Sequence, residues 1–160
     1  MYYFRKLQSF TMVFGLCVVF LLGACPIEDN GHVDTEFIPI GEWMSDFDRY
    51  TITDTHVYYV FDMSEWDLPN DILTGSIEKA VDFSKNSGVL IIKTSEATYN
   101  TVNKYKGVYY REYKNSSIKI STAINSDFSP VETDSLNAAL SLFTVDNVST
   151  HVSMWGSYSR

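Results

Sequence analysis

The chain has 160 residues, with 12 Lys and Arg, 20 Asp and Glu, and a formal net charge of −8. A surface with this excess of acids repels the phosphate backbone of nucleic acids, so the composition argues against a nucleic-acid-binding protein. The length corresponds to about one domain, at roughly 100–200 residues per domain. No repeat of fixed period is visible along it.

The first 25 residues have the organisation of an export signal. The cations Arg5 and Lys6 precede an uncharged run over 7–24, and Leu21-Leu22-Gly23-Ala24-Cys25 closes it. This order is typical of a secretory signal, and its end resembles the lipobox of bacterial lipoproteins. The resemblance implies cleavage between Ala24 and Cys25 and acylation of the Cys25 thiol. The alternative is an uncleaved membrane helix, for which the run of 18 residues is at the lower limit of the ~17–25 required.

Cleavage would leave 136 residues, 25–160, with 10 cations and 20 acids, hence a net charge of −10. Cys17 would be removed and Cys25 acylated, so no internal disulfide is expected. Residues 26–36 carry four acids, one Pro and one Gly without periodicity, and His32 lies among them. We therefore predict a signal peptide (1–24), a lipidated flexible tether (25–36) and one domain (37–160). The protein would be exported and attached to a bacterial membrane through the lipid on Cys25, on the periplasmic face or at the cell surface.

From residue 37 onward, β-branched and aromatic runs separated by turn residues predict short strands. The predicted strands cover 40–44, 50–53, 56–61, 89–92, 106–113 and 117–124. Residues 66–71 are predicted to be a loop. Residues 74–83 fit the period of a strand and that of a helix. We favour a strand there, because a tight turn over 85–88 joins the segment to the strong strand that follows it.

A helix is predicted near the end of the chain. Ser129 would be its N-cap, Pro130 its first residue and Glu132 the partner in a capping box. Val131, Leu136, Ala139, Leu140 and Phe143 would form its apolar stripe. A closing strand is predicted over 150–155. In the strand over 117–124, the isoleucines share one face while the other face is expected to meet water.

About eight strands and one late helix predict a mainly β domain, either a small antiparallel barrel or a curled sheet, because closure removes exposed edges. Gly41-Glu42-Trp43 on the first strand resembles the Gly-X-Trp that opens lipocalin and related calycin barrels. That resemblance implies a cup for a small apolar ligand, and a late basic side chain, Arg111 or Lys119, packed on Trp43.

Residues 40–158 are also similar to small spirochaete lipoproteins of unknown function. The likeness depends on the early Glu42-Trp43, the central Ser87-Gly88-Val89 and the late Trp155-Gly156-Ser157-Tyr158.

The sequence contains no catalytic or metal-binding motif among those with known mechanics. We interpret His56 and His151 as polar residues at strand ends. The acids of 46–48 and 62–67 could meet as paired carboxylates, but acids in turns are usually solvated, and this is the interpretation we adopt. We therefore expect no catalytic residue, no metal, no cofactor and no enzymatic activity.

Two functions remain. The first is a lipocalin-like module that binds a small apolar ligand at residues the sequence does not identify. The second is a structural or interaction lipoprotein that contacts an envelope or host protein through strand edges and exposed tyrosines, which combine apolar area with a polar tip.

Overall fold

The computed structural model of the protein describes residues 37–152 and 154–160. The predicted signal peptide (1–24) and tether (25–36), with Cys25 and His32, lie outside the described residues, so their assignments stay predictions. No helix within the described ranges combines the length and the apolar character that a membrane span requires.

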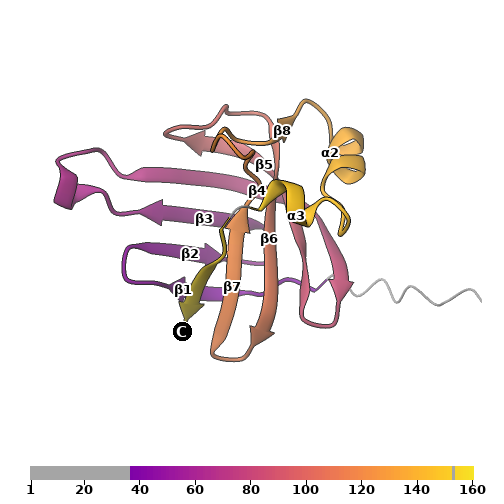
Figure 1. The fold of residues 1–160 in the computed structure, drawn as a ribbon, viewed down its shortest axis with the longest axis horizontal. Helices are drawn as coiled ribbons and strands as arrows, with labels where there is room; N and C mark the ends of the chain where they lie inside the picture. Colours follow the sequence, from indigo (N-terminus) through magenta and orange to yellow (C-terminus); the bar gives the residue numbers. More distant parts are fainter. Residues whose placement is uncertain (1–36, 153) are drawn as a thin grey trace, which may run out of the picture. The chain divides into compact units, whose positions relative to one another are not determined.

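Eight strands form a closed antiparallel barrel, which confirms the mainly β barrel predicted from the sequence (Figure 1). They are β1 (Gly41–Met44), β2 (Asp48–Ile52), β3 (His56–Phe61), β4 (Asp71–Ser84), β5 (Ser87–Ala97), β6 (Tyr105–Lys114), β7 (Ser117–Thr122) and β9 (Gly156–Ser159). Strands β1 to β7 pair in chain order, and β9 closes the ring between β7 and β1. The two-residue β8 (Glu132–Thr133) pairs with the start of β6.

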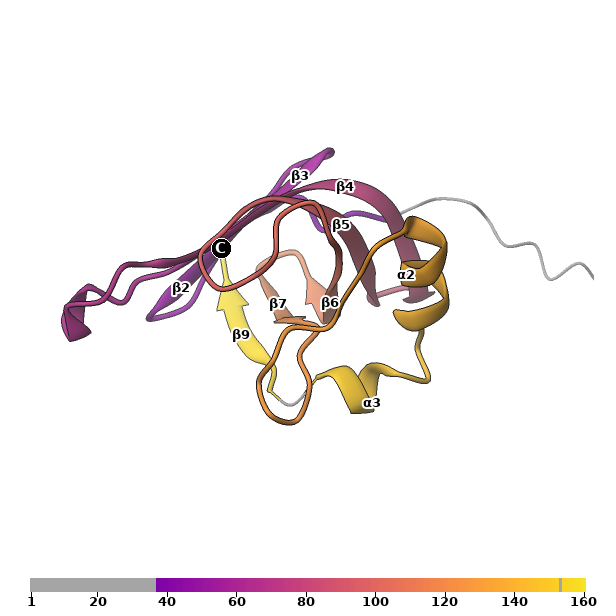
Figure 2. The same ribbon diagram turned by 90° about the horizontal axis from the view of Figure 1, so that it is seen from above.

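Closure of the ring depends on the long, bent strand β4. Residues 71–76 of β4 pair with β3, and residues 73–84 pair with β5, with register shifts after Thr74, Ile77 and Asp82. Such bulges increase strand twist and bending, and Figure 2 shows β4 and β5 curving around the barrel. The segment 74–83, which fitted two periodicities, is therefore a strand, as predicted.

The inside of the barrel is a packed core. Alternate residues of each strand face inward, so Val108 and Tyr110 of β6 lie inside while Tyr109 lies outside. The buried interior consists of Trp43, Tyr50, Ile52, Val57, Leu73, Ala80, Leu90, Ile92, Val108, Tyr110, Ile118, Ile120 and Tyr158.

The end of the barrel that carries the β2–β3, β4–β5 and β6–β7 turns is called the base. Trp43 is fully buried there, and its indole nitrogen donates to the Pro39 carbonyl at 2.9 Å. The Arg160 guanidinium lies 4.2 Å from the centre of the indole and also donates to the Ile40 carbonyl. Gly41, at φ 153°, allows this contact, because a Cβ there would lie 2.5 Å from the guanidinium. Arg160 thus covers Trp43 at the base.

The prediction that Arg111 or Lys119 packs on the tryptophan was wrong. Arg111 lies over Trp155 at 4.2 Å, and Lys119 donates to Glu112 at 2.9 Å. Both cations project from the outer surface of the barrel, whereas β9 brings Arg160 beside β1. The basic partner of Trp43 is therefore supplied by the last residue of the chain.

A second buried cluster covers the outer face of β5 and β6 beneath two short helices, α2 (Leu136–Leu142) and α3 (Val148–His151). Its buried members are Val89, Ile91, Tyr109, Ala123, Val131, Ala139, Phe143 and Val152. Phe143 packs directly on the backbone of Gly107, where a Cβ would lie 2.8 Å from the ring. Ser121 and Ala123 are buried, so the expectation that their face of β7 and its extension meets water was wrong at these two positions, whereas Lys119 on the same face is partly exposed.

The predicted helix start and closing strand were also wrong. Pro130 forms a β-bridge with Ile124 instead of opening a helix. The N-cap of α2 is Ser135, whose hydroxyl accepts from the Ala138 amide at 3.3 Å. Residues 148–151, which overlap the predicted strand, form α3, and the closing strand begins later, at Gly156.

Candidate functional site

Aromatic side chains fill the barrel where a lipocalin-like cup would lie. The end opposite the base, called the mouth, carries the loops at 45–47, 62–70 and 98–104 and the segment at 123–131. Near it, the Tyr50 ring lies 4.6 Å from that of Tyr59 and 5.3 Å from that of Tyr158, between ring centres. Tyr158 donates to an Asp48 carboxylate oxygen at 2.7 Å. Burial raises the pKa of all three tyrosines, so they stay neutral.

A hollow of about 140 Å³ remains at the mouth, and it holds a buried cation. Lys106 is 1% exposed, and its ammonium donates to the Asn100 side chain. Burial lowers the pKa of Lys106 to about 8, although the carboxylates of Glu132 and Asp71 act in the opposite direction. The volume is below the ~300 Å³ at which ligand pockets usually begin, so this hollow accommodates a group of only a few atoms.

A larger cavity, called the groove, lies on the outer wall of the barrel between β6 and α3. Its volume is about 650 Å³, within the usual range of ~300–1,000 Å³ for ligand sites. Phe83 forms part of its wall on the barrel side, and Val145, Val148 and Val152 line it on the helix side, with Trp155 after them. The four-residue helix α3 supplies Val148 and Ser149 to this lining.

Two polar side chains of β6 face into this apolar groove. Tyr109 is 0% exposed, and its hydroxyl has no hydrogen-bond partner among the described residues. Burial raises the pKa of Tyr109 to about 12, so the phenol is a neutral donor at physiological pH. Alternation along the strand places Arg111 on the same face, where its guanidinium stacks on Trp155.

Arg111 retains donor capacity in this arrangement. Its Nε atom is buried without a hydrogen bond and lies 3.6 Å from a Glu112 carboxylate oxygen, the same oxygen that Lys119 contacts at 2.9 Å. The Arg111 side chain is 43% exposed, whereas the Tyr109 hydroxyl is buried and unpaired and carries a desolvation cost of about 1–3 kcal/mol, which a bound acceptor would remove. Tyr109 and Arg111 together can therefore bind an anionic oxygen.

The histidines are placed apart from this chemistry. His56 begins β3 and stacks on Tyr58 at 5.8 Å. His151 ends α3, not a strand as predicted; burial lowers its pKa, and its Nδ1 atom has no hydrogen-bond partner in the described ranges. Across residues 37–152 and 154–160, no group of His, Cys, Asp or Glu side chains is arranged to hold a metal ion.

The acids of the two predicted turns do come near one another. Asp48 and Asp62 line one hollow of about 310 Å³ at the mouth, together with the apolar side chains of Met44, Phe47 and Val60. Asp62 accepts a hydrogen bond from the Ser64 amide at 2.9 Å, and hydrogen bonds from Ser64 lower its pKa. This carboxylate therefore stays ionised at neutral pH.

Sequence reasoning did not find the groove. One feature of the sequence could have indicated it. Val89, Ile91 and Tyr109, on the outward face of β5 and β6, are too apolar for a surface that meets water. That pattern indicates a covering layer, but not which segment supplies it. Trp155 and Val148 reach the groove only because α3 folds back on the barrel.

Comparisons with known proteins do not assign the chain to a family. No protein-family model matches it, and no curated protein or solved structure shows significant similarity to it. The barrel is compatible with a lipocalin-like fold.

Proposed function

We propose that the protein is a lipid-anchored, extracytoplasmic binding module that holds a small amphipathic anion in the groove. The observation that carries this proposal is the buried, unpaired Tyr109 hydroxyl on the same strand face as the Arg111 guanidinium, in a cavity of about 650 Å³ lined by both apolar and polar side chains. The lipobox ending at Cys25 supports export and anchoring.

The lining of the groove specifies the class of ligand. A carboxylate can accept from the neutral Tyr109 phenol and from Arg111, and hydrogen bonds to charged groups are the stronger ones. The apolar part of the ligand would contact Phe83, Val148 and Val152. A cationic ligand is disfavoured, because it would meet a guanidinium and a phenol that cannot release its proton at neutral pH. The barrel thus serves as a rigid wall for the ligand and does not enclose it.

The ligand site is tested by calorimetric titration of 4-phenylbutyrate into the full-length protein in phosphatidylcholine nanodiscs, with empty nanodiscs subtracted. We expect binding of this probe and none of 4-phenylbutanol, its uncharged analogue. Arg111→Gln should weaken binding by about 10–100-fold, equivalent to about 1.5–3 kcal/mol for a charged hydrogen bond, and Tyr109→Phe by about fivefold.

Lys93→Gln is the matched control, because Lys93 lies on β5 near Tyr105 and outside the groove lining. Equal affinity for the acid and the alcohol, or an Arg111→Gln titration identical to that of wild type, would contradict the proposal.

The anchor is tested separately by metabolic labelling with a radioactive fatty acid. Cys25→Ala should abolish the label, because the acylated thiol would be absent. Undiminished labelling of that variant would rule out the lipobox assignment while leaving the groove measurement unaffected.

A further inference from the structure

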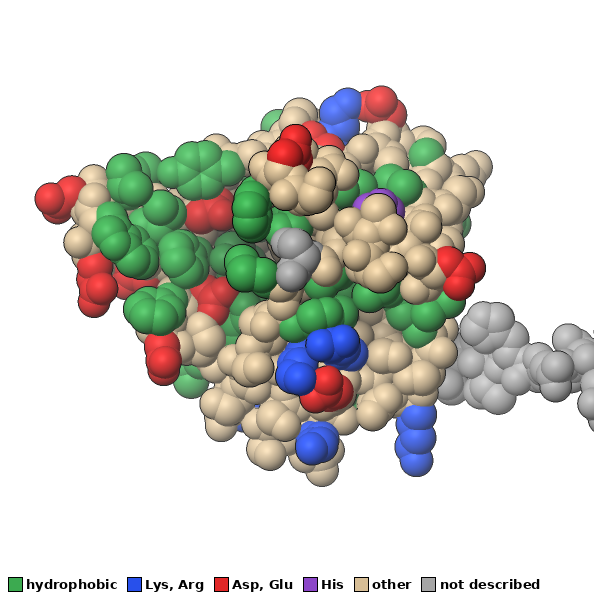
Figure 3. All heavy atoms as spheres, in the orientation of Figure 1, with side chains coloured by type: hydrophobic (Ala, Val, Ile, Leu, Met, Phe, Trp, Pro, Cys, Tyr) green, Lys and Arg blue, Asp and Glu red, His purple; other side chains and the backbone are tan. Residues whose placement is uncertain are grey.

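The loops at the mouth expose large apolar side chains to solvent, unlike the turns at the base. The mouth rim consists of Met44, Phe47, Trp66, Leu68, Tyr99, Val102 and Phe128, each 44–65% exposed. They come from all four segments at the mouth, whereas the base turns at 53–55, 85–86 and 115–116 contain only polar residues. Figure 3 shows apolar side chains gathered over the ends of the β1–β2 and β3–β4 hairpins. An exposed apolar area shared by four loops is typical of an interaction site.

Acidic side chains surround this apolar rim. Asp46, Asp62, Glu65 and Asp67 lie on the same two loops as Phe47 and Trp66, and Figure 3 shows acids among the apolar side chains. Two lysines near the mouth do not neutralise these acids, because Lys104 pairs with Asp134 and Lys106 is buried. Arg49 of β2 is exposed and lines the hollow of about 310 Å³ together with Asp48 and Asp62. The acids of the two loops outnumber this cation, so the rim favours a partner with a positive charge.

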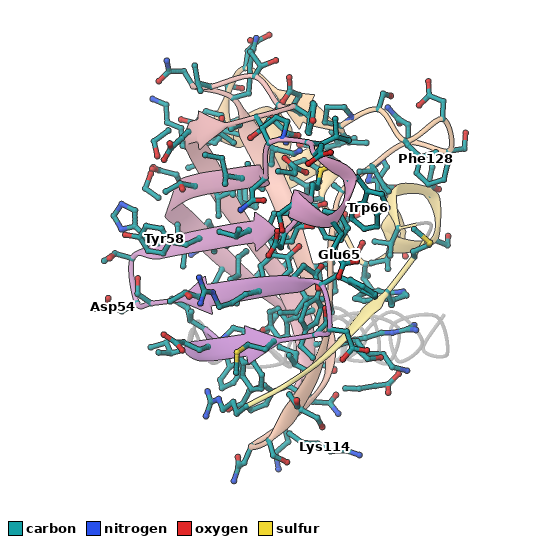
Figure 4. All side chains as sticks on the ribbon, turned by 90° about the vertical axis from the view of Figure 1, so that its left-hand side faces the viewer. Asp54, Tyr58, Glu65, Trp66, Lys114 and Phe128 are labelled. Atoms are coloured by element: carbon teal, nitrogen blue, oxygen red, sulfur yellow. The ribbon has the colours of Figure 1, made fainter. Side chains whose placement is uncertain are left out.

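Local contacts hold the rim in position. The Trp66 ring stacks on Phe61, with 6.0 Å between ring centres, and the Met63 amide donates to the Asn70 side chain at 3.1 Å. Phe128 adopts a positive φ of 65°, a conformation that costs a bulky residue about 1–3 kcal/mol wherever it persists. In Figure 4, Trp66 and Phe128 lie on the same side of the molecule, and Tyr58 and Asp54 lie on the other. A rim fixed in advance loses little conformational entropy on binding.

We propose that the mouth rim docks a polypeptide segment of another protein that combines apolar and basic side chains. Apolar side chains of that segment would cover Trp66, Phe47 and Phe128. A Lys or Arg side chain would enter the hollow of about 310 Å³, with its stem against Met44 and Phe47 and its charged end at Asp62. A second copy of the chain is disfavoured, because the acids of the two rims would repel each other, and so is a membrane with anionic lipids.

The test uses the full-length protein in phosphatidylcholine nanodiscs and a fluorescent decapeptide of alternating Leu and Lys, with anisotropy as the readout. We expect saturable binding that weakens with salt, and at least fivefold weaker binding of the Leu-Glu and Ser-Lys peptides. Phe47→Ser and Trp66→Ser should each weaken binding by at least about fivefold, and Asp62→Asn should reduce its salt dependence.

Lys85→Ser and Asp54→Asn, at the base, are the matched controls and should bind as wild type does. The rim residues are exposed, so the far-UV circular dichroism and the midpoint of thermal unfolding of their variants should match wild type and exclude misfolding as the cause. The proposal is overturned if the Leu-Glu peptide binds as well as Leu-Lys, or if Phe47→Ser binds as wild type does. It is also overturned if sedimentation shows self-association that Phe47→Ser abolishes, which would make a second copy the occupant. Groove variants such as Tyr109→Phe should leave peptide binding unchanged, so this proposal and the proposed function can fail independently.

Discussion

The two ends of the barrel differ in packing and in the exposure of apolar side chains. At the base, Trp43 is fully buried under Arg160, and the turns are polar and short. At the mouth, the loops are longer, large apolar side chains are exposed, and a lysine is buried beside acids. We therefore expect the base to contribute more to stability than the mouth, which retains features that cost stability. Features of the second kind are expected where a protein binds something.

Truncation of the base tryptophan should destabilise the protein strongly. Trp43→Ala removes the largest fully buried side chain and leaves a cavity under Arg160, so we expect a loss of about 3–5 kcal/mol in the free energy of unfolding. Urea denaturation measures it. Trp66→Ala, at the mouth, is the matched control and should change stability by less than about 0.5 kcal/mol. Similar losses for both variants would mean that the two ends contribute equally to stability.

Replacement of the buried lysine at the mouth should stabilise the protein at neutral pH. Burial lowers the pKa of Lys106 from 10.5 to about 8, which corresponds to about 3 kcal/mol against the charged form. Lys106→Met removes that cost but also loses the hydrogen bond to Asn100. We therefore expect the free energy of unfolding at pH 7 to increase by about 1–3 kcal/mol.

The pH dependence of that gain has a definite sign. Between pH 8 and 10.5 the folded wild type binds fewer protons at Lys106 than the unfolded chain does, so wild-type stability rises with pH in this window. The advantage of Lys106→Met should therefore shrink as the pH increases from 7.5 to 9.5. Denaturant titrations at both pH values check this, and a constant difference between the two proteins would contradict it.

Removal of the cation that covers Trp43 should have a moderate effect. Arg160→Gln loses the contact of the guanidinium with the indole and its hydrogen bond to Ile40, for an expected cost of about 1 kcal/mol. The midpoint of thermal unfolding measures it. Arg49→Gln, an exposed arginine on β2, should leave the midpoint unchanged. An equal shift for both would show that charge, and not the stack at the base, is responsible.

Polar substitution in the mouth rim should have the least effect on stability. Phe47→Ser exchanges a side chain that is 55% exposed, so the free energy of unfolding should change by less than about 0.5 kcal/mol. Solubility should increase, because the exposed apolar area decreases. Light scattering at high protein concentration measures this, with Asn115→Ser at the base as the control. A loss of stability comparable to that of Arg160→Gln would show that the rim belongs to the core.

The barrel could be predicted because its strands carry local signals. The alternation of apolar and polar residues in β7 and the run of β-branched residues in β5 are visible in the sequence itself. The same is true of Gly41-Glu42-Trp43, which begins β1. The predictions were wrong where a local sequence pattern favoured one structure but contacts with distant residues stabilised another. Ser129 and Pro130 have the pattern of a helix start, yet Val131 is buried in the outer layer and Pro130 bridges to Ile124.

The groove and the partner of Trp43 could not be predicted for a related reason. In the sequence, Arg160 and Trp43 are separated by almost the whole domain. Arg111 and Trp155 are separated by more than the length of a strand. Nothing local relates such residues. Burial of the outer face of β6 signalled a covering layer, but its identity depended on how α3 packs.

By itself, the sequence determined that the protein has a mainly β domain with short antiparallel strands and one late helix, because period-two patterns and turn residues act within a few positions. It also gave the prediction of an anchor at Cys25, which depends on adjacent residues alone. The tertiary structure decided that the sheet closes, that its inside is packed and that a cavity of about 650 Å³ lies on the outer wall. These properties depend on contacts between residues far apart in the chain, where side-chain volume and closure geometry decide.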